Sequence, residues 1–476
     1  MKRLKLLCLF FPISLMPLFA HQKAEDLLQG YLQNDLNVKK LTNSLQNQVL
    51  EDKATKISNG WNFKIESGTV TVTTDGEHRR VTFSPSAELS IPQLNNLTLG
   101  ASADIKYKEE DGTDTKNKSL YMSVDLYSKN KQKLEVTKLK SERSVLEASR
   151  ALQNGLITAE KDFYTELKSL YSTAASIVKA ENDLYDDQLA FNEIRAKGYI
   201  AGSLKYRQAE MKVLSGERNV EINKRELERQ TKIFASKCGI EYDGNDAVEF
   251  LPDSVPQAEA VDVLSFKKEA FAKIEKATWT NRINTLNRNA DSKITVRGKA
   301  GYTFDNSSTD SDTLDLGSSL TWNGTGLTAS AGVSWPLKTD SFYPVYTFGL
   351  SFSPQPFLLA NITDQQKEIA EEQEKIDIQS AEKDYQTEMI SRQTQLSDIQ
   401  WKKKTNEESL DMYKKLAADE ERYYRQGYVT LSEYRNAKAN KENYEIQCLI
   451  NDIELLIYND ETKLLFCRDD EIKAIK

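Results

Sequence analysis

Four landmarks of this 476-residue chain occur twice, and the members of every pair are 228 to 230 residues apart. Chance can produce one such pair, but four unrelated pairs with a common offset indicate an internal duplication of nearly the whole chain. The chain is therefore predicted to fold as two copies of one unit. The pairs are Gly198 and Gly427, Cys238 and Cys467, residues 206–209 and 434–437, and residues 97–101 and 327–331.

Both halves have the same order of parts, a helix followed by a strand-rich segment and two more helices. The first repeat, residues 21–239, is predicted to contain helix 24–58, strands within 61–128, and helices 130–197 and 204–238. The second repeat, residues 257–468, is predicted to contain helix 257–291, strands within 293–353, and helices 357–426 and 431–467. A linker at 240–256 joins the repeats, and residues 469–476 form a C-terminal tail.

The strand-rich segments contain Gly, Ser, Thr and aromatic residues, with apolar and polar positions alternating as at 97–107. Turn signals occur at Asp75-Gly76, Asp111-Gly112 and Asn323-Gly324. Each segment has room for four strands. The predicted strands are 61–74, 80–91, 97–108 and 119–128 in the first half, and 293–304, 313–322, 326–335 and 344–353 in the second.

The charged helices after the strands are unusually long. A continuous helix over 130–197 or 357–426 reaches about 100 Å, more than a compact domain needs. The helices that return, 204–238 and 431–467, carry apolar residues at mixed spacings of three and four. Such spacing is typical of seams between helices, so paired coiled-coil rods are predicted.

Residues 1–20 have the features of a secretory signal peptide. Lys2, Arg3 and Lys5 precede a short apolar run, and Ala20 provides a small residue for cleavage. A membrane anchor is the alternative, but the run is shorter than the ~20 apolar residues of a spanning helix. The mean hydropathy is −0.59 and no other apolar stretch approaches that length. A membrane-crossing form of the chain therefore requires a closed β-barrel.

The sequence offers little for catalysis or metal binding. It has two histidines, His21 and His78, and without the leader its three remaining cysteines show no zinc or CxxC spacing. The formal net charge of −8 becomes −11 when the leader is removed, because 64 basic residues fall to 61 against 72 acidic ones. An acidic chain lacks the basic patches that bind nucleic acid. We expect no enzyme activity, no cofactor, no metal and no nucleic-acid partner.

The segment Tyr424–Ala437 resembles the hairpin-tip motif of the TolC-type outer membrane factors, the outer membrane efflux proteins. In that family a Tyr-x-x-Gly precedes a run that ends in alanine. The first half keeps Gly198, but Arg195 replaces the tyrosine and one extra residue precedes Ala209. Segments 92–94 and 350–354 also resemble strand boundaries of the family, and the resemblance spans residues 24–468.

The resemblance implies a mainly helical fold with membrane strands: a trimeric outer-membrane β-barrel continued by a long α-helical periplasmic tunnel. It implies a passive outer-membrane channel with efflux transmembrane transporter activity, in a tripartite efflux or type I secretion system. The partners would be two further copies, outer-membrane lipid, a periplasmic adaptor and an inner-membrane pump of unknown class. Relatives supply two strands per half, so four or eight strands per subunit enter the barrel. The alternative function is a periplasmic adaptor or scaffold with helical hairpins.

The hairpin tips are candidate adaptor-docking sites. Gly198 and Gly427 are predicted to adopt left-handed backbone conformations after a helix, where a side chain is costly. The tyrosines that follow, Tyr199 and Tyr428, belong to the same turns. A helix C-cap and a docking tip are compatible interpretations, because a surface turn can serve as both.

Glu433, Asn436 and Tyr424 are candidates for the periplasmic constriction implied by the resemblance. Threefold symmetry would turn Glu433 into a ring of three carboxylates, which favours cations. Residues 430–433 also form a capping-box sequence, which is the preferred interpretation of Glu433. Asn436 replaces a second family acid, and Tyr424 matches a family tyrosine implicated in closing the mouth, with a packed seam position as the alternative.

Aromatic residues in the strand segments form a candidate girdle at the lipid–water boundary, with ordinary strand packing as the alternative. Two further tryptophans, Trp279 and Trp401, lie on predicted helices and are predicted to be core residues. The candidate girdle residues are Trp61, Tyr107, Tyr121, Trp322, Trp335, Tyr343 and Tyr346.

Overall fold

The computed structural model describes residues 23–75, 78–108, 112–242, 244, 247–304, 312–337 and 343–468. The predicted signal peptide 1–20, His21 and the predicted tail 469–476 lie outside these residues. The chain divides into two compact units. The sheet unit is built from Lys40–Gln153, Phe266–Glu388 and Phe466–Lys476, and the helical unit from Met1–Lys39, Asn154–Ser265 and Met389–Leu465. Both halves of the duplication contribute to each unit.

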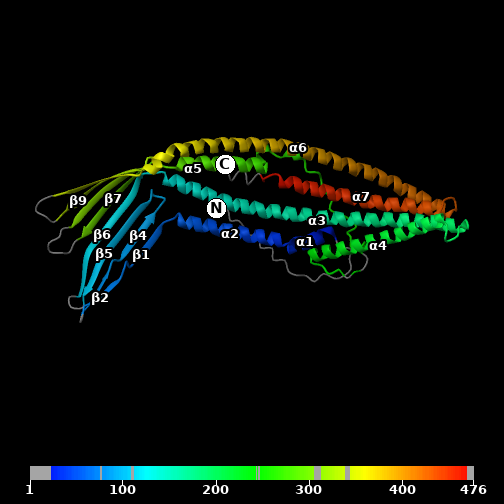
Figure 1. Cartoon of the computed structure of the whole chain (residues 1–476), viewed down its shortest axis with the longest axis horizontal. Helices are drawn as coiled ribbons and strands as arrows, with labels where there is room; N and C mark the ends of the chain where they lie inside the picture. The colour runs from blue at the N-terminus through cyan, green and yellow to red at the C-terminus, as the bar shows by residue number, and fades with distance from the viewer. Residues whose placement is uncertain are drawn as a thin grey trace. The chain divides into compact units, whose positions relative to one another are not determined.

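The described strands of the sheet unit form one antiparallel sheet (Figure 1). They are β1 Asn62–Glu66, β2 Thr71–Asp75, β3 His78–Phe83, β4 Ser86–Ile91, β5 Leu97–Lys108, β6 Gly112–Tyr127, β7 Ile294–Phe304, β8 Thr313–Trp322, β9 Leu327–Pro336 and β10 Val345–Phe352. The hydrogen-bonded order is β1-β4-β5-β6-β7-β8-β9-β10, and the β2–β3 hairpin joins through β3 to β5. β6 of the first half pairs with β7 of the second, so the two strand segments merge.

Two predicted strands of the first half are each divided in two. The predicted strand 61–74 becomes β1 and β2, because Gly68 turns the chain with φ of 65° where a Cβ would lie 2.3 Å from the Ser84 carbonyl oxygen. The predicted strand 80–91 becomes β3 and β4 around Pro85, which has no N–H for a ladder. Its carbonyl still accepts a hydrogen bond from the Ala103 amide at 3.0 Å. The four strands predicted for the second half are present as β7 to β10.

Helices pack beside one another at the base of the sheet unit. They are α2 Leu36–Ser58, α5 Ala272–Ala290, and the first parts of α3 Asn130–Ala196 and α6 Pro354–Arg425. Val136 of α3 packs with Ile283 and Ala290 of α5 in a small apolar cluster. The same two helices also share a buried charge network, which joins the first repeat to the second.

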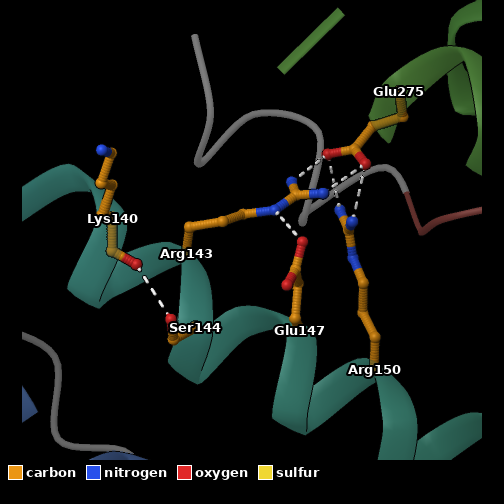
Figure 2. A network of polar contacts seen from close by, with 6 residues as sticks. All are labelled: Lys140, Arg143, Ser144, Glu147, Arg150 and Glu275. Carbon is orange, nitrogen blue, oxygen red and sulfur yellow. Dashed lines mark hydrogen bonds and ion pairs between the residues drawn. The ribbon is translucent and has the colours of Figure 1, made fainter. Parts of the chain in front are cut away.

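Glu275 of α5 lies at the centre of this network (Figure 2). Arg143 and Arg150, two turns apart on α3, both direct their guanidinium groups at its carboxylate. The Arg143 Nη2 donates to Glu275 Oε2 at 2.8 Å, and Arg150 Nη1 donates to the same oxygen at 2.9 Å. Glu147 accepts from the Arg143 Nε at 2.8 Å. The side chains of Arg143 and Glu275 are only 5% and 6% exposed, so each charge depends on its partners.

The helical unit contains α1 Ala24–Asn34, α4 Leu204–Cys238, α7 Leu431–Leu464 and the remaining parts of α3 and α6. Side-chain contacts place its long helices in the order α4-α3-α7-α6 (Figure 1). Thr173 of α3 bonds Gln230 of α4 at 3.2 Å, and Lys168 of α3 bonds Glu454 of α7 at 2.6 Å. Helix α1 closes the core by inserting Tyr31 against the ring of Phe163. α4 and α6 are therefore the outer members of the layer.

The predicted helix 24–58 is wrong at one residue, because the chain breaks between α1 and α2 at Asp35. The Asp35 carboxylate accepts hydrogen bonds from the amides of Asn37 at 2.6 Å and Val38 at 3.2 Å, so it starts a second helix. Short polar side chains favour such caps over helix interiors.

The predicted helix 257–291 is wrong in its first half. Residues 257–262 are not helical, short 3₁₀ turns occupy Val263–Ser265 and Lys268–Ala270, and α5 begins at Ala272. The buried Asn459 of α7 explains the start of this stretch. It accepts a hydrogen bond from the Val261 amide at 2.9 Å and donates one to the Glu259 carbonyl at 2.9 Å, holding the backbone extended.

Among the described residues, no helix combines the length and the apolar character that a bilayer span requires. The described cysteines, Cys238, Cys448 and Cys467, are free thiols. Burial raises the pKa of the Cys238 thiol to about 12, so this thiol stays protonated at neutral pH.

Candidate functional site

One row of directly paired residues crosses eight strands of the sheet and is apolar throughout. Residues that face each other in an antiparallel pair have side chains on the same face. The row therefore marks a single apolar face. It runs Phe63, Leu89, Leu99, Met122, Ala300, Leu316, Val333 and Tyr346.

The adjacent row lies on the opposite face, because side chains alternate along a strand. It is polar or small in seven of its eight positions. The row runs Lys64, Glu88, Gly100, Tyr121, Gly301, Asp315, Ser334 and Val345. The sheet thus separates an apolar face from a polar one across its whole width.

The apolar face is exposed. Phe63 is 54% exposed at one side of the sheet, Met122 is 44% exposed in its middle, and Phe348 is 82% exposed at the other side. A soluble protein seldom exposes a continuous apolar surface of this extent without a partner for it.

The sheet is also open at both sides. Among the described strands, β1 pairs with β4 alone, β2 with β3 alone, and β10 with β9 alone. Open strands carry free backbone donors and acceptors and are a template for further pairing.

The predicted girdle residues divide between the two faces. Trp61 precedes β1, and Trp322 ends β8 opposite Ile294, so both lie at the end of the sheet where the helices attach. Trp335 lies opposite Leu314 toward the other end, and Tyr107 has the same parity as Ile105 on β5. Tyr346 is on the apolar face, and Tyr343 precedes β10 and is 70% exposed.

Tyr121 is on the polar face, so its place among lipid-facing girdle residues is wrong. Its hydroxyl donates to Glu88 Oε2 at 2.7 Å, and its ring covers Gly100. A Cβ on Gly100 would lie 2.1 Å from that ring, so the glycine makes room for the tyrosine. The girdle role of the other aromatics stays a prediction.

The two hairpin tips of the helical unit have the same backbone geometry. Gly198 and Gly427 both have φ of 77°, which confirms the predicted left-handed conformation. At the second tip, the Tyr428 amide donates to the Tyr423 carbonyl at 2.9 Å and the Gly427 amide donates to the Tyr424 carbonyl at 3.0 Å. The first tip repeats this Schellman pattern with Tyr199.

Replacing Gly427 by alanine should lower the free energy of unfolding by about 1 kcal/mol, because a Cβ is strained in the left-handed region. Gly202 is the matched control, since it has open space around it and no positive φ. Gly202→Ala should leave stability unchanged or slightly raised. Chemical denaturation of both variants checks this, and equal effects would contradict the assignment.

Glu433 forms the predicted capping box. The Thr430 hydroxyl accepts from the Glu433 amide at 3.3 Å, and the Thr430 amide donates to the Glu433 carboxylate at 2.7 Å. That backbone hydrogen bond holds the pKa of Glu433 below its usual range. The cap therefore contributes above the usual carboxyl range and is lost as the pH falls through the lowered pKa.

Thr430→Ala should destabilise α7 by about 1 kcal/mol, because an N-cap acceptor is lost. Thr394, on the exposed side of α6, is a suitable control, and Thr394→Ala should change stability by less than about 0.5 kcal/mol. Urea titrations monitored by circular dichroism separate the two. A Thr430 variant as stable as the control would show that the capping box contributes nothing.

Asn436 does not leave the tip region without an acid, because α3 supplies one. The Ser432 hydroxyl donates to Asp186 Oδ1 at 2.7 Å, and Asn436 Nδ2 approaches Asp186 Oδ2 at 3.5 Å. Sequence reasoning missed Asp186, which lies in a charged run resembling any solvated helix face. Tyr424 stacks on Tyr434 with centroids 5.7 Å apart, which is a seam position. No signal in the sequence links these positions across 246 residues.

The described residues contain no group of three or more His, Cys, Asp and Glu side chains arranged to hold a metal ion. The expectations that the chain is not an enzyme and needs no cofactor remain predictions. The chemistry that the described surfaces offer is contact with apolar material on one side of the sheet and with water on the other.

These features define a class of protein: a duplicated chain with an open, two-faced antiparallel sheet and a layer of long helices. Residues 27–257 match the family model of the TP096X N-terminal domain, and residues 256–469 match that of the TP096X C-terminal domain. The chain therefore contains both TP096X domains, one after the other. The boundary between the two matches falls at the end of the predicted linker 240–256.

A curated relative is an uncharacterized protein of Treponema pallidum (strain Nichols), 28% identical over 179 residues. The match covers 37% of this chain, and the chain spans only 32% of the length of that relative. Its printed description assigns no activity.

Among solved structures, the outer-membrane channel OprN has 13% identity and a TM-score of 0.47, covering 93% of this chain and 90% of that chain. The CmeC outer membrane channel of Campylobacter jejuni has 13% identity and a TM-score of 0.45, with coverages of 95% and 88%. The open-state MtrE outer membrane channel of Neisseria gonorrhoeae has 12% identity and a TM-score of 0.46, with coverages of 93% and 90%. TM-scores below 0.5 carry no conclusion about this chain.

Proposed function

We propose that this chain is a subunit of an outer-membrane channel that passively conducts substrates to the cell exterior. The observation that carries the proposal is the exposed apolar face of the sheet, backed by a polar face through all eight strands of the crossing rows. Lipid contact on one side and water on the other is the arrangement of membrane strands that line a pore.

Strand lengths support this proposal. β7, β8 and β9 contain 11, 10 and 10 residues. A strand tilted in a bilayer needs about 9 to 11 residues to cross the hydrocarbon. The apolar residues of β10 alternate over its full length, from Tyr346 to Phe352. The sheet therefore has the height and the polarity that insertion requires.

The open sides of the sheet support self-assembly. Within a bilayer, unpaired backbone groups cost several kcal/mol each, so an open sheet has to be closed by further strands. In a homotrimer, β10 of one copy would pair with β1 and β2 of the next, and no open strand would remain. Each copy would then supply eight strand positions to a common barrel.

The hairpin tips are the proposed contact with a periplasmic adaptor, which would link the channel to an inner-membrane pump. Their apolar side chains are exposed: Ile200 at 77% and Tyr428 at 78%. The Glu433 and Asp186 carboxylates near the second tip are the proposed charged part of the periplasmic mouth. The helices would stand in the periplasm and the sheet in the outer membrane.

Cell fractionation tests the location and the assembly together. The full-length protein should sediment with outer-membrane barrels on a density gradient and resist extraction by carbonate. On a gel run without boiling it should migrate as a homo-oligomer that heating dissociates. Recovery as a monomer in the periplasmic fraction would overturn the proposal and favour the adaptor or scaffold alternative.

A further inference from the structure

Helix α4 carries a line of exposed apolar side chains with a spacing of 11 residues. Met211, Ile222 and Ile233 are 70%, 63% and 45% exposed. Eleven residues are close to three full helical turns, so these side chains lie along one line on the helix. The α4 stripe has no cover within the described chain.

Helix α6 carries a second line with the same spacing. Ile390, Trp401, Met412 and Tyr423 are 66%, 67%, 57% and 40% exposed. The prediction that Trp401 is a core residue is therefore wrong for the single chain. A tryptophan two-thirds exposed in a regular apolar line indicates a surface that another body covers.

Each apolar line is accompanied by a line of charge, and the two charges are opposite. Beside the α4 stripe, Arg207, Arg218 and Arg229 recur at the same 11-residue spacing. Beside the α6 stripe, Asp398, Glu408 and Asp419 recur at spacings of 10 and 11 residues. All six charged side chains are exposed. The two surfaces thus match in periodicity and are complementary in charge.

Within one chain the two stripes cannot cover each other. The contacts of the helical unit place α4 and α6 at opposite sides of the layer, with α3 and α7 between them. We propose that α4 of one copy packs antiparallel along α6 of the next copy, so that the helical layers join side by side. The proposal rests on the proposed function only for the cyclic arrangement of copies.

The contacts inside one copy also fix the register of this interface. A closed ring has rotation without translation along its axis, so axial levels within one copy hold between copies. Ser432, the second residue of α7, bonds Asp186, which lies ten residues before the end of α3. The α6–α7 tip is therefore set back from the α3–α4 tip by about eight residues, or roughly 12 Å.

This offset brings opposite charges to the same level. Asp419 lies six residues before the end of α6, and Arg218 lies fourteen residues after the start of α4. The difference of eight residues equals the offset, and Glu408 and Arg229 satisfy it as well. The proposed pairs are Arg218 with Asp419 and Arg229 with Glu408, with the apolar lines packed between them.

Existing contacts leave these charges available. Asp419 pairs with Arg422 at 2.9 Å, and Arg229 pairs with Glu226 at 2.5 Å, both on their own helices. Exposed pairs three residues apart on one helix contribute little, so they can exchange for contacts across an interface.

A charge-exchange experiment tests the pairing. Arg218→Glu and Asp419→Arg each place like charges together, so each should reduce the oligomer obtained after chemical cross-linking by about fivefold. The double variant restores the pair in reverse and should recover oligomer to within about twofold of wild type. The matched control combines Arg218→Glu with Asp398→Arg, which lie at different levels and should not recover.

Cysteine pairs provide a second readout that does not depend on charge. Ile222→Cys combined with Leu416→Cys should yield an intermolecular disulfide on oxidation, because the offset puts the two positions at one level. Glu217→Cys combined with Leu416→Cys is the control, since five residues turn the helix by about 140°. Wild type in a parallel lane reports any bridging by the native cysteines.

The outcomes decide the inference. Recovery by the matched double variant, with a disulfide from the matched cysteine pair, supports the interface. Single charge variants that assemble as wild type, or equal recovery by the mismatched variant, overturn it. Assembly is measured here without conductance, so an oligomer with this register that passes no current would contradict the channel function and leave the interface standing.

Discussion

Glu275→Gln lowers the free energy of unfolding by about 3 to 5 kcal/mol in this account, the largest single effect expected for the chain. Burial alone would raise the pKa of Glu275, but the hydrogen bonds from Arg143 and Arg150 hold it below the usual carboxyl range. The group is thus charged when folded. Removing its charge leaves two guanidinium groups without their shared carboxylate, and one of them, that of Arg143, is almost fully buried.

Glu382 provides the control for this variant. It pairs with Lys268 at 2.8 Å, but the two side chains are 43% and 44% exposed. Glu382→Gln should change stability by less than about 1 kcal/mol. Denaturant titration of both purified variants measures the difference. Similar small effects would show that the buried network does not hold α3 against α5.

Acid should act on the same network. Because the pKa of Glu275 is lowered on folding, its contribution is complete above the ordinary carboxyl range and is lost as the pH falls through the lowered value. The wild-type protein should therefore lose stability more steeply below that range than Glu275→Gln does. Thermal melting over a pH series shows whether the two curves converge in acid.

Phe348→Lys should destabilise the membrane-inserted protein by about 2 to 4 kcal/mol, because it places a charge on the apolar face near the middle of β10. Phe348 is 82% exposed and lies opposite Ala331. No contact inside the chain is lost that could explain such a cost. The effect therefore depends on lipid facing this surface.

Thr347→Lys is the matched control, since Thr347 is the neighbouring residue and faces the polar side. It should cost less than about 1 kcal/mol, because a charge facing water needs no desolvation. Both variants are folded into lipid vesicles and unfolded with urea. Equal costs, or a larger cost for Thr347→Lys, would mean that lipid does not contact the Phe348 side.

The duplication and the second strand segment could be predicted because both depend on local pattern. β7 to β10 alternate regularly between apolar and polar residues, and short turns separate β8 from β9. The two left-handed glycines could be predicted for the same reason, since each ends a helix at a corresponding position of the repeat. These features need no knowledge of distant contacts.

Features that depend on distant contacts could not be predicted. Asn459 holds the backbone at Val261 extended across 198 residues, and this replaced the predicted start of a helix. Tyr121 alternates with its neighbours as a girdle residue would, but the face it occupies depends on pairing with Gly100 and Gly301. Sequence alone gives the period of a strand, and not which of its faces meets water.

The buried network was hidden by its composition. Arg143, Glu147 and Arg150 have the spacing of an exposed, charged helix face, and charged helices are usually solvated. Their burial follows from Glu275, which is 132 residues from Arg143. The exposed stripes of α4 and α6 were hidden in the same way, because an apolar spacing of 11 residues predicts packing without naming the partner.

The central claim is that strands of several copies enclose a water-filled path through the outer membrane. The most direct test is to add the purified native oligomer to a planar lipid bilayer under voltage and record the current. The account predicts discrete, stable steps of ionic current that scale with the number of inserted oligomers. A folded oligomer that inserts into the bilayer and yet never passes current would contradict it.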